Sequence, residues 1–131
     1  MTVSARQAWF DEFDPASRPL WVLTDPSDEV QGWLSLHSFY GRPAYAATVE
    51  VSVYAHPLAQ RRGVGTSLLH HALESAPRLG IRTMLGFVFG HNTPSIALFE
   101  QAGFMAWGHL PRVAELDGIE RDLAILGRRI P

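Results

Sequence analysis

The sequence contains no cysteine, which excludes disulfide bonds, catalysis by a thiolate and zinc sites built from cysteine ligands. It has no surplus of basic residues either, because the formal net charge at pH 7 is −2. A chain of this charge is not expected to bind nucleic acid or an anionic membrane. No apolar run approaches the ~20 residues that span a bilayer, and the first residues lack the apolar core of a secretion signal. These absences together predict a cytoplasmic protein.

What the chain does contain is typical of a folded globular domain. Hydrophobic residues make up 47% and charged residues 18% of the 131 positions, a balance that argues against disorder. The length suits one domain with a substantial core. We therefore expect residues 1–131 to form a single domain.

The segment Gln60-Arg61-Arg62-Gly63-Val64-Gly65-Thr66 is the most informative part of the sequence. Two glycines at alternate positions let backbone N–H groups approach a ligand without interference from a Cβ atom. A helix that begins just beyond them supplies unpaired N–H donors and the positive end of its dipole. These features predict a cradle for an anion, best suited to phosphate, with charge-assisted contacts from Arg61 and Arg62. The alternative is an ordinary turn beside two solvated arginines.

Hydrophobic periodicity and turn residues predict an α/β layered domain. Helices are expected over residues 4–13, 66–76 and 94–102, with Thr93 as the N-cap of the last helix and Pro94 at its first position. Strands are expected over residues 20–24, 31–39, 47–54, 83–89, 104–113 and 119–126.

The order of these features resembles the GNAT N-acetyltransferase superfamily: a strand, the glycine loop, a helix, a strand, Asn92, a short helix and Ala102-Gly103-Phe104. Within it, residues 42–45, 48–54, 92–95 and 108–110 resemble the phosphinothricin acetyltransferase branch. The resemblance covers roughly residues 5–127. It implies an α/β (α+β) GNAT-type fold, with a mixed, mostly antiparallel sheet and helices on both faces. It also implies acetyl-CoA as the cosubstrate.

The resemblance assigns the acetyl-CoA contacts to the end of the central strand, the glycine loop and one asparagine. These residues are Val53, Tyr54, Ala55, Arg61, Arg62, Gly63, Val64, Gly65, Thr66 and Asn92. In the family the strand splays near Val53, its backbone pairs with the pantetheine arm, and an N–H group polarises the thioester carbonyl. Tyr54 as a core aromatic and Asn92 as a turn or capping residue remain alternatives.

Glu50 is the candidate general base. Strand alternation places it on one face with Ser52 and Tyr54, and its carboxylate can take a proton from the acceptor ammonium directly or through water. The alternative is a solvated strand residue or an ion-pair partner. Arg42 and Tyr45 are candidates for acceptor binding through a carboxylate, with loop packing or a subunit contact as the alternative.

Two departures from the family pattern affect these expectations. The chain resembles a family member shortened at its N-terminus, without the usual first strand and helix. Phe99 occupies a position where the family usually carries Tyr or His, a side chain held to protonate the departing thiolate or assist the base. His37 or His109 is a possible substitute for that acid. None of the six histidines has metal-ligand spacing, so no metal is expected.

These residues predict an N-acetyltransferase of class EC 2.3.1.-, in which a small amine, such as an amino acid or an analogue, attacks the thioester directly. A non-catalytic acyl-CoA-binding or assembly module and a protein acetyltransferase are the alternatives. A sheet edge and apolar surface left uncovered by the missing elements predict a homodimer.

Overall fold

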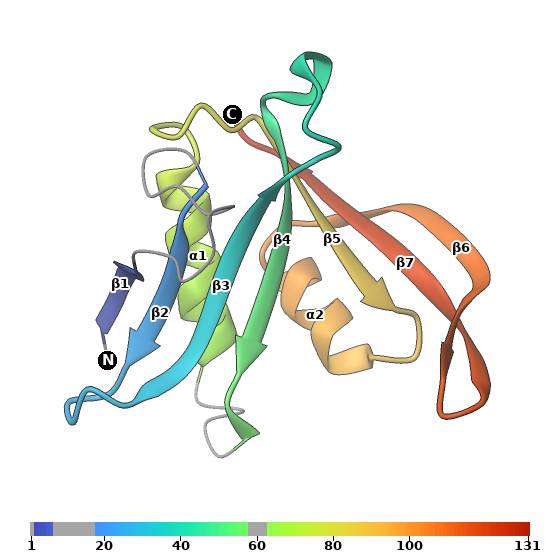
Figure 1. The fold of residues 1–131 in the computed structure, drawn as a ribbon, viewed down its shortest axis with the longest axis horizontal. Helices are drawn as coiled ribbons and strands as arrows, with labels where there is room; N and C mark the ends of the chain where they lie inside the picture. The colour runs from blue at the N-terminus through green and yellow to red at the C-terminus, as the bar shows by residue number, and fades with distance from the viewer. Residues whose placement is uncertain (1, 7–17, 58–62) are drawn as a thin grey trace.

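The computed structural model describes residues 2–6, 18–57 and 63–131, which form one seven-stranded sheet with a helical layer against it (Figure 1). The strands are β1 Thr2–Arg6, β2 Leu20–Thr24, β3 Val30–Ser38, β4 Thr48–Ala55, β5 Thr83–Phe89, β6 Met105–Leu116 and β7 Ile119–Arg129. The helices are α1 Val64–Ser75 and α2 Thr93–Gln101, and a 3-10 turn, η1, covers Pro43–Tyr45. The strand order across the sheet is β1-β2-β3-β4-β5-β7-β6.

Neighbouring strands of the sheet pair antiparallel, except that β4 and β5 run parallel. The expectation of a mixed, mostly antiparallel sheet is therefore confirmed. Strands β2 and β5 coincide with the ranges expected from the sequence, 20–24 and 83–89, and β3, β4, β6 and β7 differ from their expected ranges only at their ends. The long loop between β3 and β4 carries η1 and projects beyond the end of the sheet (Figure 1).

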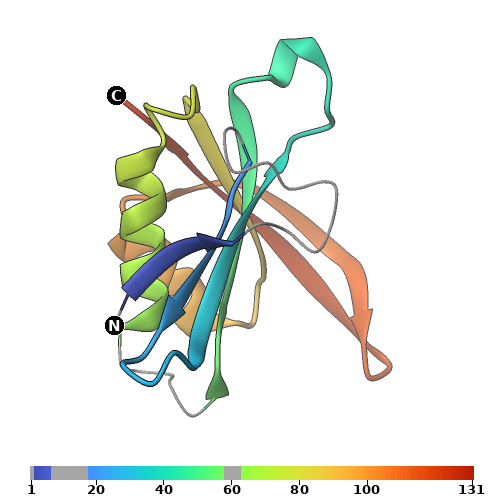
Figure 2. The same ribbon diagram turned by 60° about the vertical axis from the view of Figure 1, so that its left-hand side comes forward.

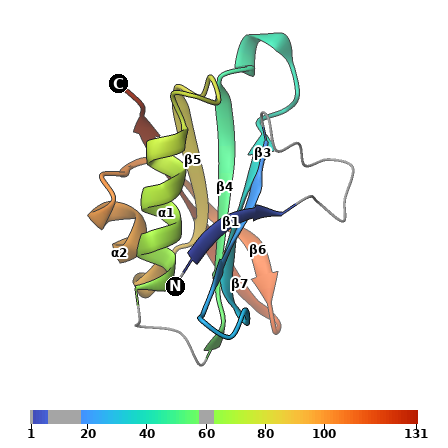
Figure 3. The same ribbon diagram turned by 90° about the vertical axis from the view of Figure 1, so that its left-hand side faces the viewer.

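The core lies between the sheet and α1. Alternate residues of β3 and β4 point toward the helix, as the period-2 geometry of a strand requires. Both described helices lie on this face of the sheet (Figure 3), whereas the sequence analysis expected helices on both faces. The side chains that meet there are no more than 3% exposed: Leu34, Leu36, Val49, Val51, Leu68, Leu69 and Ala72.

Strand β1 includes residues 4–6, for which a helix was expected. That expectation is wrong over Ser4–Arg6, and residues 7–13 lie outside the described residues. The strand pairs antiparallel with β2, with Val3 opposite Leu23. This pairing satisfies backbone groups that β2 would otherwise present at a bare edge, a tertiary gain that outweighs a weak local propensity. The edge of β2, which was expected from the sequence to be uncovered, is therefore paired with β1.

The β6–β7 hairpin extends away from the helical layer (Figure 2). Its turn residues Asp117 and Gly118 have φ angles of 52° and 77°, the signs that a type I′ hairpin turn requires. Farther along, the register shifts between Leu110 and Ala114, where Arg112 has a φ of 52°. The Asp122 carboxylate accepts the Arg112 backbone N–H at 2.8 Å. This hydrogen bond, followed by one from His109, lowers the pKa of Asp122.

Helix α2 packs closely against β5 where the Phe99 ring lies over Gly86. The Phe99 side chain is 5% exposed and packs edge-on against Phe104, with 4.9 Å between ring centroids. A Cβ atom built on Gly86 of β5 would lie 2.8 Å from Cε1 of Phe99. A side chain at position 86 would therefore force the helix or the ring to move.

We expect Gly86→Ala to lower the free energy of unfolding by about 1–3 kcal/mol, because the added methyl group overlaps a buried ring. Phe99→Leu alone should also destabilise, because it removes buried apolar surface. In the double variant the smaller side chain leaves room for the methyl group, so the two losses should add to less than their sum. Urea unfolding of the four chains measures this coupling, and strictly additive losses would contradict the contact.

Candidate active site

A gap opens in the sheet between β4 and β5. Their parallel ladder joins Thr48 to Thr83, Val49 to Met84 and Glu50 to Leu85, and it ends at that last pair. Both strands continue, and Figure 1 shows them diverging beyond this point. On its other side β4 stays paired with β3 as far as Ala55. The backbone groups of β4 that face the gap are therefore available to an extended ligand.

The N-terminus of α1 lies at the end of this gap, near the end of β4 (Figure 1). Gly63 is the N-cap, with a φ of 76°, and its carbonyl accepts the Ser67 N–H at 2.9 Å. The cap makes no side-chain hydrogen bond, and the first turn holds no acidic residue. The N–H groups of the first turn and the positive end of the dipole would suit an anion, and the anion cradle at this place stays a prediction. Gln60, Arg61 and Arg62 lie outside the described residues.

Two glycines near the cradle, Gly65 and Gly32, allow close packing of α1 against its neighbours. A Cβ atom on Gly65 would lie 2.9 Å from Cδ2 of Leu98 in α2. A Cβ atom on Gly32 in β3 would lie 2.6 Å from Cγ1 of Val64, whose side chain is 2% exposed. From the sequence, Gly65 was expected to allow the approach of a ligand, with an ordinary turn as the alternative. The structure adds a second reason for glycine there, because α1 begins in contact with both β3 and α2.

Glu50 lies at the point where the gap opens, on the sheet face opposite the two described helices. The burial pattern of β4 supports the alternation expected from the sequence, since Val49 and Val51 are buried and Glu50 is half-buried. In the β3–β4 register, Glu50 is opposite His37. Tyr54 is on the same face and is 43% exposed, so it is not a core residue.

An aromatic pair lies farther along this face. Tyr54 is opposite Trp33 in the β3–β4 register, and the two rings stack with 5.7 Å between centroids. Ser52 and Ser35 form the register pair between these rings and the pair of Glu50 and His37. The face of β3 and β4 is therefore polar near Glu50 and aromatic toward the cradle end.

Arg42 and Tyr45, the predicted acceptor-binding residues, belong to the projecting loop around η1. The Tyr45 backbone N–H donates to the Arg42 carbonyl at 2.9 Å. The Tyr45 ring packs edge-on against Phe39, with 5.5 Å between centroids, and Tyr40 packs on the same phenylalanine at 4.3 Å. Because β4 begins at Thr48, this loop lies at the Glu50 end of the strand and the cradle lies at its other end (Figure 1).

Asn92, and not Thr93, is the N-cap of α2. The Asn92 Oδ1 atom accepts a hydrogen bond from the Ser95 backbone N–H at 3.3 Å. The capping alternative for Asn92 is therefore confirmed, and the expected role of Thr93 is wrong because the helix begins one residue earlier than expected. A contact of Asn92 with the cofactor stays a prediction.

The structure distinguishes between the two histidines considered as substitutes for an acid at position 99. His109 is opposite Ala124 in the β6–β7 register, and its Nε2 atom lies 2.9 Å from Oδ2 of Asp122. Following the register from β4 through β5 and β7 places His109 on the sheet face opposite Glu50. His37 shares the face of Glu50. Phe99 itself is buried in the helical layer and has no proton to transfer.

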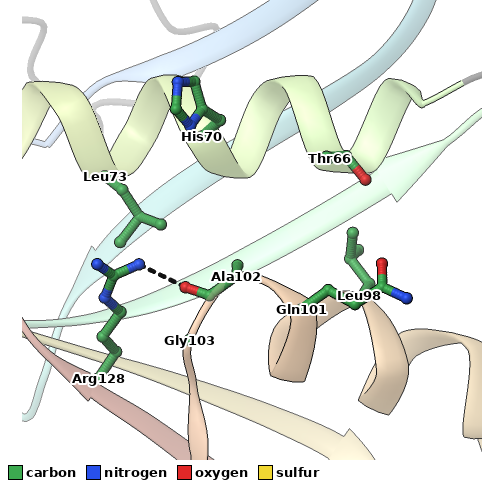
Figure 4. A pocket seen from close by; sticks show the side chains of 8 residues that line it. All are labelled: Thr66, His70, Leu73, Leu98, Gln101, Ala102, Gly103 and Arg128. Carbon is green, nitrogen blue, oxygen red and sulfur yellow. Dashed lines mark hydrogen bonds between the residues drawn. The ribbon is translucent and has the colours of Figure 1, made fainter.

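A pocket of about 370 Å³, which the sequence did not reveal, lies in the helical layer (Figure 4). It adjoins the cradle, with which it shares Thr66. The guanidinium of Arg128 donates to the Ala102 carbonyl at the end of α2 and closes one side. The lining residues are Thr66, His70, Leu73, Leu98, Gln101, Ala102, Gly103 and Arg128.

Residues 2–6, 18–57 and 63–131 contain no group of three His, Asp or Glu side chains placed to hold a metal ion. Within the same ranges, neither helix has the length and apolar character of a membrane span.

Comparisons with known proteins agree with this fold and site. The model of the acetyltransferase (GNAT) family matches residues 2–104. YwnH of Bacillus subtilis, provisionally named a phosphinothricin acetyltransferase, is 48% identical over 130 residues, which cover 99% of this chain and 79% of YwnH. An L-methionine sulfoximine/L-methionine sulfone acetyltransferase of Pseudomonas paraeruginosa is 32% identical over 121 residues, covering 92% of this chain and 70% of that protein.

Solved structures give the same result. A crystal structure provisionally titled a phosphinothricin N-acetyltransferase superimposes with a TM-score of 0.88 at 49% identity, covering 94% of this chain and 77% of that one. A GNAT superfamily phosphinothricin acetyltransferase from Sinorhizobium meliloti in complex with AcCoA has a TM-score of 0.82 at 31% identity, covering 86% of this chain and 61% of that one.

The chain belongs to the GNAT acetyltransferase family. It is an N-acetyltransferase of class EC 2.3.1.-, and acetyl-CoA is its acetyl donor. The residues present fit this donor: the N-terminus of α1, which has no side-chain cap, suits a diphosphate, and the edge of β4 beyond Glu50 suits an extended amide-bearing arm.

Thr66→Glu should weaken acetyl-CoA binding by tenfold or more while leaving the fold intact. Thr66 is exposed in the first turn of α1, where a carboxylate stabilises the helix dipole but repels an anionic ligand. Thr66→Gln, similar in size and neutral, is the matched control. Gly65→Glu would be a poorer test, because Leu98 leaves no room for any side chain there. Calorimetry with CoA measures the effect, and equal affinities of the two Thr66 variants would contradict the cradle.

Proposed function

We propose that this protein acetylates the α-amino group of a small amino acid or amino-acid analogue, with Glu50 as the general base. The observation that carries the proposal is the position of Glu50. The β4–β5 ladder ends at this residue, so its carboxylate stands where the gap opens, and the cradle lies at the far end of the same gap. A ligand held at the cradle and extended along β4 would bring its reactive end to Glu50.

The chain offers contacts for each part of the donor. The cradle formed by Gly63, Val64, Gly65 and Thr66, with Arg61 and Arg62 from the sequence, suits the diphosphate. The backbone of Val53, Tyr54 and Ala55 suits the pantetheine arm, with the side chain of Asn92 across the gap. The pocket beside Thr66 provides space for the remainder of the molecule. Acetyl-CoA supplies an activated thioester carbonyl, which a backbone N–H of β4 would polarise.

Glu50 would make the acceptor nucleophilic. An amine at neutral pH is mostly an ammonium ion, which has no lone pair for attack. The carboxylate of Glu50 takes one proton from it, directly or through water, and the neutral amine then attacks the carbonyl carbon. Beyond this proton transfer, the chain contributes mainly by holding the two reactants in position.

The names of the relatives suggest the acceptor class. Phosphinothricin, L-methionine sulfoximine and L-methionine sulfone are named in them, and each is an amino-acid analogue with a free α-amino group and a carboxylate. Arg42 is exposed on the loop nearest the Glu50 end of β4. Its guanidinium is suited to that carboxylate, and Tyr45, packed on Phe39, would hold the loop.

Acetyl-CoA turnover across the three analogues and the common amino acids tests the proposal. Release of CoA can be followed with a thiol reagent, and the absence of cysteine from the chain removes any background from the protein. Turnover of an analogue and loss of turnover with its methyl ester would support recognition of the carboxylate. Arg42→Gln should then raise the acceptor KM and leave the acetyl-CoA KM unchanged.

Two alternatives make different predictions in the same assay. A non-catalytic acyl-CoA-binding or assembly module, favoured by Phe99, would bind CoA without turnover of any acceptor. A protein acetyltransferase would act on peptides in preference to free amino acids. The enzyme cannot complicate that comparison by acetylating its own lysines, because the chain contains none.

Glu50→Gln should lower kcat by about 100-fold or more, because the amide keeps the shape of the side chain but cannot accept a proton. The acetyl-CoA KM should not change, since the cradle and the β4 backbone are untouched. Glu115→Gln, on the exposed β6 strand, makes the same chemical change at a distance and should retain the wild-type rate. A kcat of Glu50→Gln within about twofold of the control would remove Glu50 from the role of base.

We also propose a homodimer, with the N-terminal half or the 42–45 loop in the contact. The loop supports this, because Tyr40 is 76% and Tyr45 41% exposed within one aromatic cluster. Light scattering at micromolar concentration should give about twice the chain mass of 14.6 kDa, and a single species at that mass would contradict the dimer. The cytoplasmic location stays a prediction.

A further inference from the structure

A histidine lies beside Glu50 on the open face of the sheet. His37 of β3 is the register partner of Glu50 in β4. Cβ atoms of such cross-strand partners are roughly 4.5–5.5 Å apart, and their side chains share a face. An imidazole can therefore reach the carboxylate that the proposed function uses as the base.

The His37 ring is oriented by a buried hydroxyl. Its Nε2 atom lies 3.0 Å from Oγ of Ser35, two residues earlier on the same strand. Ser35 is only 2% exposed, so its hydroxyl needs a hydrogen-bond partner. The contact with His37 provides that partner and restricts the rotation of the ring.

Other charged groups near His37 come from the segment before β2. The Pro19 carbonyl accepts the Leu36 N–H at 3.3 Å, which places Arg18 across from His37. The Arg18 guanidinium donates to Oγ of Ser38 at 2.9 Å and to the Ala46 carbonyl at 2.8 Å. The two helices described in the structure lie on the other face of the sheet. His37 is thus flanked by Glu50 from β4 and Arg18 from the β2 side, with Ser35 on its own strand.

We propose that His37 is a positioning and proton-relay residue that acts through Glu50. The inference rests on the proposed role of Glu50 as the base. One N–H bond of the acceptor ammonium breaks, and its proton goes to the Glu50 carboxylate. The Glu50 carboxyl passes that proton to the His37 imidazole, which releases it to water and so restores the carboxylate. Imidazole suits this step because it both accepts and donates protons near neutral pH.

The rest of the transfer balances without His37. The neutral amine forms the new N–C bond, and the C–S bond of the thioester breaks. The departing thiolate takes the second proton from the attacking nitrogen. The net products are the acetylated amine, CoA and one proton, which leaves through His37. No oxidant, reductant or metal is needed.

The first test does not depend on turnover. NMR of the histidine ring protons reports the surroundings of each ring. In Glu50→Gln the ring signals of His37 should shift, because the side chain opposite it in the β3–β4 register is changed. His109 is the internal control: its ring signals should shift in Asp122→Asn and not in Glu50→Gln. His37 ring signals that are the same in the wild type and in Glu50→Gln would overturn the inference.

The second test measures kcat and KM with acetyl-CoA and L-methionine sulfone as the acceptor probe. His37→Gln should lower kcat by about tenfold, leave the acetyl-CoA KM unchanged and alter the acid limb of the pH profile. Ser35→Ala should act in the same direction with a smaller effect. His109→Gln, the same substitution on the opposite face, should match the wild type. A merely structural role would not change the pH profile.

The outcomes separate this inference from the proposed function. If the wild-type chain turns over the probe and His37→Gln behaves like His109→Gln, the relay is wrong and the proposed function stands. If the wild-type chain turns over no acceptor, the proposed function fails, and the relay fails with it. A lower kcat with a shifted acid limb in His37→Gln, together with shifted His37 ring signals in Glu50→Gln, supports the relay.

Discussion

The early end of the parallel pairing between β4 and β5 is the constraint on which the rest of the site depends. Had the ladder continued past Glu50 and Leu85, the backbone of β4 would be satisfied by its neighbour and no extended ligand could pair with it. Behind the gap, Phe99 fills the space over Gly86, so α2 closes the helical side while the strands stay apart. In the gap, the backbone groups of β4 form no ladder with β5 and can pair with a ligand instead.

Much of the fold was accessible from the sequence, because its signals are local. Strand β5 is an uninterrupted apolar run, and the β2–β3 hairpin turns at Asp25, whose carboxylate accepts the Ser27 and Glu29 N–H groups. The N-terminal strand was missed because pairing with β2, a contact between distant residues, decides the conformation of Ser4–Arg6. Propensity in so short a segment is a weak guide when a free sheet edge is nearby.

In the candidate site too, local features could be predicted from the sequence, whereas contacts between distant residues could not. Glycines before a helix and a carboxylate in a central strand are visible as patterns, and the structure places both along one gap. Ser35 and His37 are two residues apart in a strand, so a contact between their side chains could be suspected from the sequence. The burial of Ser35 could not be predicted in this way. The pocket beside Thr66 brings together residues from α1, α2 and β7, and no sequence pattern relates these three elements.

The contact between Gly65 and Leu98 has a consequence for the cofactor site before any ligand arrives. The first turn of α1 is braced against α2 on one side and against Gly32 on the other, so the direction of its N–H groups is fixed by packing. A preorganised cradle loses little conformational entropy on binding, which leaves more of the interaction energy as affinity. The packing of the empty protein therefore requires glycine at position 65 even before the proposed approach of a ligand is considered.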